Sequence, residues 1–158
     1  FRVLSGVEVD ILADGSLDLP DELLDSLDWR VGSVHAALRQ DGGEMTRRLV
    51  KAISSGRLDT LGHPTGRLLC RRKASDFDRD AVFGACAEHD VALEINAQPS
   101  RLDLSAEDAE AAAAAGCRLT IGSDAHAPGQ MDALRFGVGV ARRAGLRVSD
   151  VVNCDMPG

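Results

Sequence analysis

The stretch Leu119-Thr120-Ile121-Gly122-Ser123-Asp124-Ala125-His126 decides the fold, because a short apolar run turns through a glycine and delivers a carboxylate and an imidazole. The pattern predicts a buried strand over 118–121 that ends in a site. Residues two apart on an extended chain point to the same side, so Asp124 and His126 are expected to grip one centre or two adjacent centres. An oxygen with a nitrogen ligand suits zinc, manganese or iron. Taken alone, such a pair is more often a helix cap and a hydrogen-bonded loop histidine.

Similar side chains follow earlier predicted strands, which favours the site. His35 and His63 each come directly after an apolar run. Glu8 and Asp10 alternate with apolar residues in the first strand and so share one face of it. The polar face of that strand is therefore expected to line a site and not to face bulk water.

Strands and helices alternate along the whole chain, which predicts a parallel α/β sheet or barrel in a single domain, 1–158. In a parallel barrel the carboxyl ends of the strands open on one face, where barrel active sites are built. His89 lies at a helix end instead and is interpreted as a capping or surface histidine. We expect strands over 6–12, 29–34, 58–61, 91–95 and 118–121, and helices that begin near 18–22 and span 45–53, 78–88, 105–115 and 131–144.

Glu8, His35, His63, Asp124 and His126 together form a ligand set carried by four strands. One metal needs three or four such groups, so five invite two or more ions with a bridging carboxylate. Sites of this kind neutralise phosphoryl groups, which points to phosphoester hydrolysis. Amide hydrolysis on a related metal barrel is the rival.

Length and composition fit one globular domain of 158 residues, 44% of them hydrophobic, with no apolar run long enough to span a bilayer. The net charge of -7 argues against a surface that wraps DNA regardless of sequence. Cys70, Cys86, Cys117 and Cys154 form no C-x-x-C pair, so four reduced thiols in a cytoplasmic protein are expected, with Cys86 and Cys117 in the core. Phe1 opens the chain without a methionine or signal pattern, which suggests a fragment of a longer protein.

One local exception to the acidic balance is a basic cluster directly after the turn at His63. It consists of Arg67, Arg71, Arg72 and Lys73. Most such clusters are solvated loop charge, but this one sits beside a candidate ligand.

Five ordered motifs resemble those of the PHP (polymerase and histidinol phosphatase) domain. The sequence between these motifs is similar to that of the PHP domain of bacterial family X DNA polymerases. The resemblance spans nearly the whole chain. The motifs are Gly6-Val7-Glu8-Val9-Asp10-Ile11-Leu12, Ser33-Val34-His35, Leu61-Gly62-His63-Pro64-Thr65-Gly66-Arg67, Glu94-Ile95-Asn96-Ala97 and Ser123-Asp124-Ala125-His126.

The resemblance implies a TIM-like, distorted (β/α)7 barrel, of which this chain would supply about five βα units, around a centre of up to three zinc or manganese ions. Glu8 would bridge two metals, and His35 and His63 would complete one of them. Asp124 would belong with the bridged partner ion and His126 with the third.

Four further residues receive supporting roles from the same resemblance. Arg67 and Arg101 would hold phosphate, although a salt bridge is the plainer explanation for each taken singly. Asp10 and Asn96 would support the ligands from behind.

The family's opening H-x-H pair has no counterpart before Glu8, so the chain alone would lack part of the coordination and two strands. The isolated fragment is expected to bind fewer ions, to be weakly active or inactive, and to expose sheet edges. For the parent protein we expect a metal-dependent 3'-5' exonuclease that cleans DNA 3' ends in repair, beside a polymerase domain in the same chain. The alternatives are a stand-alone phosphatase of a small ester such as histidinol phosphate, and a structural module without catalysis.

Overall fold

The computed structural model describes residues 3–155, so Phe1, on which the expectation of an upstream segment rests, lies outside them. Within these residues no helix is both long and apolar enough to cross a membrane. One five-stranded sheet organises the chain, with every neighbouring pair parallel and the strands in sequence order. The strands are β1 (Gly6–Asp10), β2 (Trp29–Ser33), β3 (Thr60–Leu61), β4 (Ala92–Asn96) and β5 (Leu119–Gly122).

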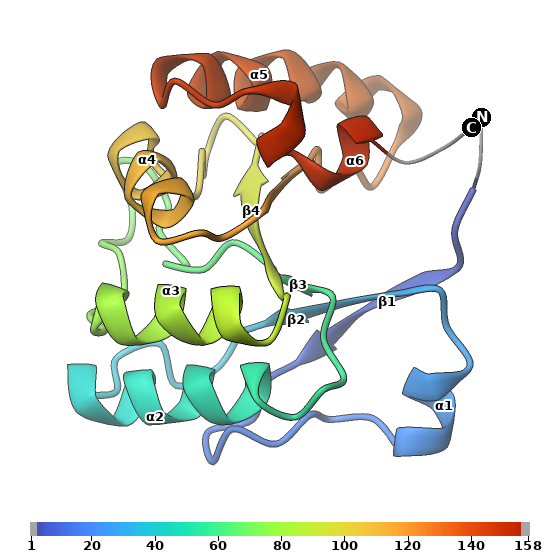
Figure 1. The fold of residues 1–158 in the computed structure, drawn as a ribbon, viewed down its shortest axis with the longest axis vertical. Helices are drawn as coiled ribbons and strands as arrows, with labels where there is room; N and C mark the ends of the chain where they lie inside the picture. The colour runs from blue at the N-terminus through green and yellow to red at the C-terminus, as the bar shows by residue number, and fades with distance from the viewer. Residues whose placement is uncertain (1–2, 156–158) are drawn as a thin grey trace.

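Helices connect successive strands, and Figure 1 shows α2, α3, α4 and α5 stacked along one side of the sheet. This confirms the predicted α/β class and the alternation of strands and helices. The helices are α1 (Asp21–Asp25), α2 (Gly42–Ile53), α3 (Arg79–Glu88), α4 (Ala106–Ala114), α5 (Leu134–Arg143) and α6 (Val152–Asp155), with 3-10 turns at Pro128–Ala133 and Val148–Asp150.

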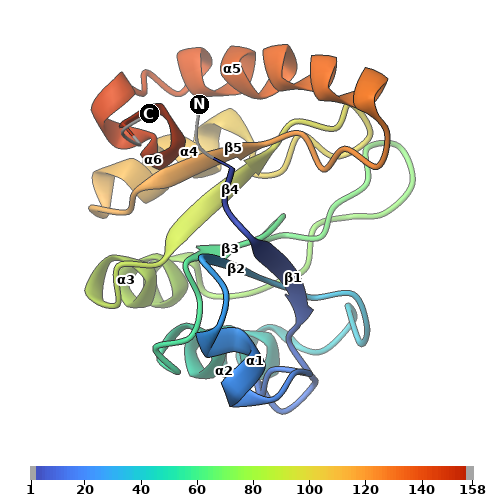
Figure 2. The same ribbon diagram turned by 90° about the vertical axis from the view of Figure 1, so that its right-hand side faces the viewer.

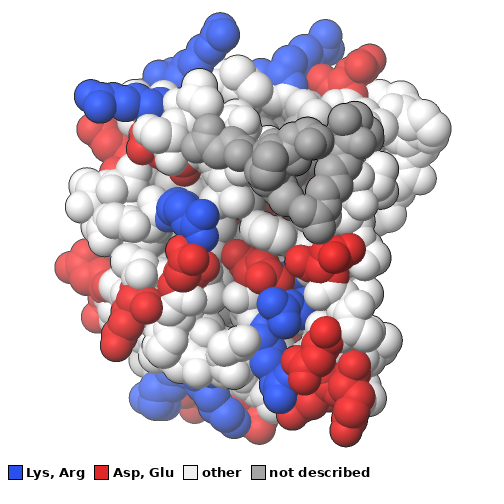
Figure 3. Space-filling model, turned by 45° about the vertical axis from the view of Figure 1, so that its right-hand side comes forward, with Lys and Arg blue, Asp and Glu red and all other residues white. Residues whose placement is uncertain are grey.

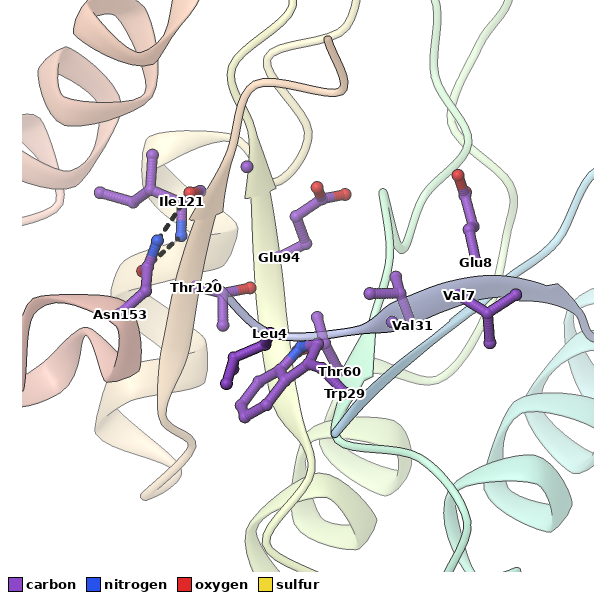
Figure 4. Close-up of a pocket in the computed structure, with 12 residues that line it drawn as sticks. Leu4, Val7, Glu8, Trp29, Val31, Thr60, Glu94, Thr120, Ile121 and Asn153 are labelled. Carbon is purple, nitrogen blue, oxygen red and sulfur yellow. Dashed lines mark hydrogen bonds between the residues drawn. The ribbon is translucent and has the colours of Figure 1, made fainter. Parts of the chain in front are cut away.

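The sheet curves away from its helices, so that its two edge strands face a common hollow. Side chains of β1 and β5 line the same space of about 440 Å3, and Trp29 and Leu4 lie in it (Figure 4). Figure 2 looks onto this side, with β1 in front of the other strands. Parallel pairing of β1 with β2 and of β2 with β3 places the carboxyl ends of these three strands close to one another.

Several element boundaries differ from those expected from the sequence. β1 stops at Asp10 because Ile11 pairs instead with Leu17 in an antiparallel bridge. α2 begins at Gly42, where the Asp41 carboxylate accepts hydrogen bonds from two free backbone N–H groups. The helix expected over 131–144 is divided, since Pro128 starts a 3-10 turn before α5.

The core lies between the sheet and its helices, and it includes Cys86 and Cys117 as predicted. The apolar spacing of the helix expected over 45–53 predicts that Arg47, Arg48 and Lys51 share its outer face, and this is wrong for Arg48. The structure leaves only 2% of Arg48 exposed. Its buried guanidinium donates hydrogen bonds to the loops that follow β1 and β2.

The edge of β5 is partly covered, so the expectation of exposed sheet edges holds only in part for this strand. Asn153 accepts a hydrogen bond from the Ile121 N–H at 3.1 Å and donates one to the Ile121 carbonyl at 3.0 Å (Figure 4). Val151 forms a parallel bridge with Leu119. The segment after α5 therefore satisfies backbone groups that a further strand would otherwise pair.

Candidate metal centre

Three side chains converge at the carboxyl ends of adjacent strands. Glu8 comes from β1, His35 from the loop after β2 and His63 from the loop after β3. The Glu8 Oε1 atom lies 3.0 Å from the His63 Nε2 atom and 3.3 Å from the His35 Nε2 atom. One possible ligand atom from each residue lies within 4.8 Å of the others, which confirms the predicted convergence.

This geometry fits a divalent metal ion. Four ligands held about 2.0–2.1 Å from zinc in a tetrahedron stand ~3.3 Å apart, close to the spacing of the Glu8 and histidine donor atoms. Two imidazoles and one carboxylate also make a donor set that zinc and manganese accept. A single ion could therefore be held by Glu8, His35 and His63, with one position left for water or substrate.

The surroundings favour ionised Glu8. The hydrogen bond from His63 lowers the Glu8 pKa to about 2, against the opposing effect of partial burial. Burial by itself would lower the pKa of His63, but the hydrogen bond to Glu8 together with the charges of Glu94 and Glu8 raises it. The Asp10 Oδ1 atom lies 2.5 Å from the His35 Nδ1 atom, so this carboxylate orients the His35 ring, as partners of metal-binding histidines do.

Glu94 in β4 holds the backbone that presents His63. His63 adopts a left-handed conformation with φ of 26°, and its N–H donates to the Glu94 Oε2 atom at 2.6 Å. A Cβ atom at Gly122 would overlap the Glu94 carboxylate, so glycine leaves room for it. Burial raises the Glu94 pKa to about 7, although the His63 N–H opposes this shift.

Sequence reasoning assigned no role to Glu94. Its signal was present in the apolar run from Val91 to Ile95, which a single carboxylate interrupts. A charged side chain inside a buried strand needs a partner, so the interruption indicates a polar network at that place. Figure 4 shows Glu94 on β4 and Glu8 on β1 as the carboxylates of this region.

Asp124 stands beside the three-residue cluster with polar neighbours of its own. Its Oδ2 atom accepts a hydrogen bond from the Asn96 amide at 3.1 Å and lies 3.6 Å from the Arg101 Nε atom. Asp124, Asn96, Glu8 and His63 line one small cavity of about 100 Å3. The structure therefore brings Asp124 and Asn96 to the candidate centre. The buried Nη1 atom of Arg101 has no hydrogen-bond partner within residues 3–155.

His126 and Arg67 are placed differently. The His126 side chain is 81% exposed, and its Nδ1 atom hydrogen-bonds the Asp124 carbonyl at 2.9 Å, so it is not gathered with Glu8. Arg67 donates to the backbone carbonyls of Arg101 and Leu102 and so fastens the loop after β4. The roles of His126 in binding metal and of Arg67 in binding phosphate stay predictions.

Arg48 is a second residue whose role the sequence interpretation missed. Its guanidinium donates to the Ile11 carbonyl, to the Ala36 carbonyl at 3.0 Å and to the Gln40 Oε1 atom at 2.9 Å. The first acceptor follows β1 and the second follows His35. Arg48 thus links the two segments that carry Glu8 and His35.

No family model matches the chain, but individual known proteins are similar to it. The DNA polymerase/3'-5' exonuclease PolX of Bacillus subtilis is 38% identical over 153 residues, which is 97% of this chain and 27% of that protein. The predicted resemblance to the PHP domain of family X polymerases is confirmed.

Proteins described as probable phosphatases are also similar to this chain. Those of Photobacterium profundum and Aliivibrio fischeri are 37% and 34% identical over 133 residues each, 78% of this chain. The chain spans 27% of the PolX protein and 52% and 51% of these two phosphatases.

Proposed function

We propose that this chain is part of a PHP-type, metal-dependent phosphoesterase that removes nucleotides from DNA 3' ends. The observation that carries the proposal is the convergence of Glu8, His35 and His63 at neighbouring strand ends. The relatives support it, because one is described as a 3'-5' exonuclease and others as probable phosphatases. Both descriptions concern cleavage of phosphoester bonds.

The proposed ligands are Glu8, His35, His63, Asp124 and His126, for zinc or manganese ions that number up to three in the complete domain. Such ions, when bound, supply charge that neutralises phosphoryl oxygens and activates water. The proposed domain is 1–158, with about five units of a distorted (β/α)7 barrel.

The protein side chains contribute position and charge. A low pKa keeps the Glu8 carboxylate available as a ligand at neutral pH. Asp10 fixes the orientation of His35, and Asn96 holds the Asp124 carboxylate. Arg101 lies beside Asp124 at the candidate centre, and its guanidinium is proposed to hold a substrate phosphate. Arg67 is proposed to assist it.

The proposed setting is DNA repair in the cytoplasm, with a polymerase domain in the same parent chain. A small phosphomonoesterase is the second candidate, because several relatives are described as probable phosphatases. The third possibility, a structural module without catalysis, is opposed by the intact geometry around Glu8.

The test uses the complete protein that carries this chain, with manganese or zinc, and compares two substrates. Release of nucleotides from a 3'-labelled single-stranded oligonucleotide is expected, and His63→Ala should abolish it. His89→Ala is the matched control, because His89 is exposed at the end of α3. Hydrolysis of a small phosphomonoester alone would replace the exonuclease proposal with the phosphatase. If His63→Ala kept both activities, the assignment of His63 to the site would be refuted.

A further inference from the structure

Two loops beside the candidate metal centre enclose a hollow of about 780 Å3. The first loop follows His35 and the second follows His63, so the hollow lies next to the strand ends that present these ligands. Its exposed cations are Arg39 from the first loop and Arg71, Arg72 and Lys73 from the second. We call it the basic hollow.

Hydrogen bonds within the second loop, and one between the two loops, hold the basic hollow in shape. The Ser75 N–H donates to the Thr65 carbonyl at 2.8 Å, and the Ser75 hydroxyl donates to the Leu38 carbonyl at 3.2 Å. Arg72 donates from Nε to the Gly66 carbonyl at 2.8 Å. The hollow is therefore a preformed feature, in contrast to charges on an independent flexible loop.

The cations of the basic hollow differ from six others among the described residues of this acidic chain, which form ion pairs with carboxylates. Within residues 3–155, none of the four forms an ion pair, and the one carboxylate in the lining is Asp76. On the face drawn in Figure 3, by comparison, lysine and arginine side chains lie beside acidic ones. The paired cations among the described residues are Arg30 with Asp59, Lys51 with Asp14, Arg57 with Asp21 and Asp25, Arg79 with Asp108, Arg101 with Asp124, and Arg118 with Asp90.

Unpaired cations in a preformed hollow suit a ligand that carries several negative charges along its length. We propose that the basic hollow binds the phosphate backbone of a single-stranded nucleic acid whose 3' end reaches Glu8, His35 and His63. This inference rests on the proposed phosphoesterase function. No aromatic side chain lines the hollow, so it offers charge without base stacking and should accept any base sequence.

The test measures binding of a fluorescent single-stranded oligonucleotide to the complete protein by anisotropy, between 50 and 200 mM salt. Each lost phosphate contact flattens the dependence of log K on log salt by about 0.7, so the triple variant Arg39→Ala/Arg71→Ala/Lys73→Ala should flatten it by about 2. The fall in affinity over this range should then be ~20-fold smaller. Hydrolysis of a small phosphomonoester should stay unchanged.

The matched control is Arg142→Ala/Arg143→Ala, which removes exposed cations from the last turn of α5, away from the loops after β2 and β3 (Figure 2). Thermal unfolding of both variants checks that they are folded. The inference would be overturned if the triple variant bound the oligonucleotide with the same affinity and salt dependence as the control variant. It would also be overturned if the protein without substitutions did not bind the oligonucleotide. Salt-sensitive binding that depends on these cations, without release of nucleotides, would uphold the basic hollow and refute the exonuclease proposal.

Discussion

Replacing Arg48 with methionine should destabilise the protein by about 2–4 kcal/mol, although the change removes a buried charge. Arg48 is 2% exposed, and no carboxylate within residues 3–155 forms an ion pair with it. Burial lowers the pKa of Arg48, which expresses the cost of holding its charge away from water. Its hydrogen bonds to the carbonyls of Ile11 and Ala36 and to Gln40 oppose that cost.

The magnitude follows from what methionine leaves behind. The Ile11 carbonyl is buried and would lose this hydrogen bond, at a cost of about 1–3 kcal/mol. The two other acceptors are partly exposed, so water can replace the guanidinium and their loss adds about 1 kcal/mol. Relief of the buried charge offsets part of this sum, so the net destabilisation is expected toward the lower end of the range.

Urea unfolding followed by circular dichroism measures the effect. With a slope of about 2 kcal/mol per molar urea, the midpoint should fall by ~1–2 M. Arg47→Met is the control. Arg47 is the exposed neighbour of Arg48 on α2, so its replacement should change stability by no more than about 0.5 kcal/mol. If Arg48→Met proves as stable as the control, the buried guanidinium is not what holds the loops after β1 and β2.

Three further predictions concern residues around the site and the sheet edge. Asp10→Asn should weaken zinc binding 10–100-fold in competition with a chelator, since it removes the carboxylate that orients His35; equal affinity would contradict this role. Burial raises the pKa of Asp103, so the folded chain binds more protons than the unfolded chain between the ordinary and the raised pKa. Stability therefore falls as pH rises through that window, and Asp103→Asn should make the fall smaller in unfolding curves recorded at several pH values, with the contribution of Glu94 remaining. Asn153→Ala should cost about 1 kcal/mol in thermal unfolding, because it removes both hydrogen bonds to the Ile121 backbone at an exposed edge.

Much of the fold was predictable because its signals are local. Alternating apolar runs and helix caps such as Ser105 and Asp78 depend on neighbours within a few residues. The convergence of Glu8, His35 and His63 was predictable for a related reason: parallel strands in sequence order place their carboxyl ends at one edge. Element boundaries were less accurate, since the end of β1 depends on the partner that Ile11 finds in Leu17.

The sequence by itself determined the order of the strands and helices, the candidate ligands and the resemblance to the PHP domain. Only the tertiary structure decided which polar side chains are buried and what they hold. Arg48 and Glu94 serve backbone groups distant in sequence, at Ile11 and at His63, and no periodicity encodes such pairings. A buried charge is tolerated only where particular donors and acceptors surround it, and that arrangement exists only after the sheet has curved and its loops have met.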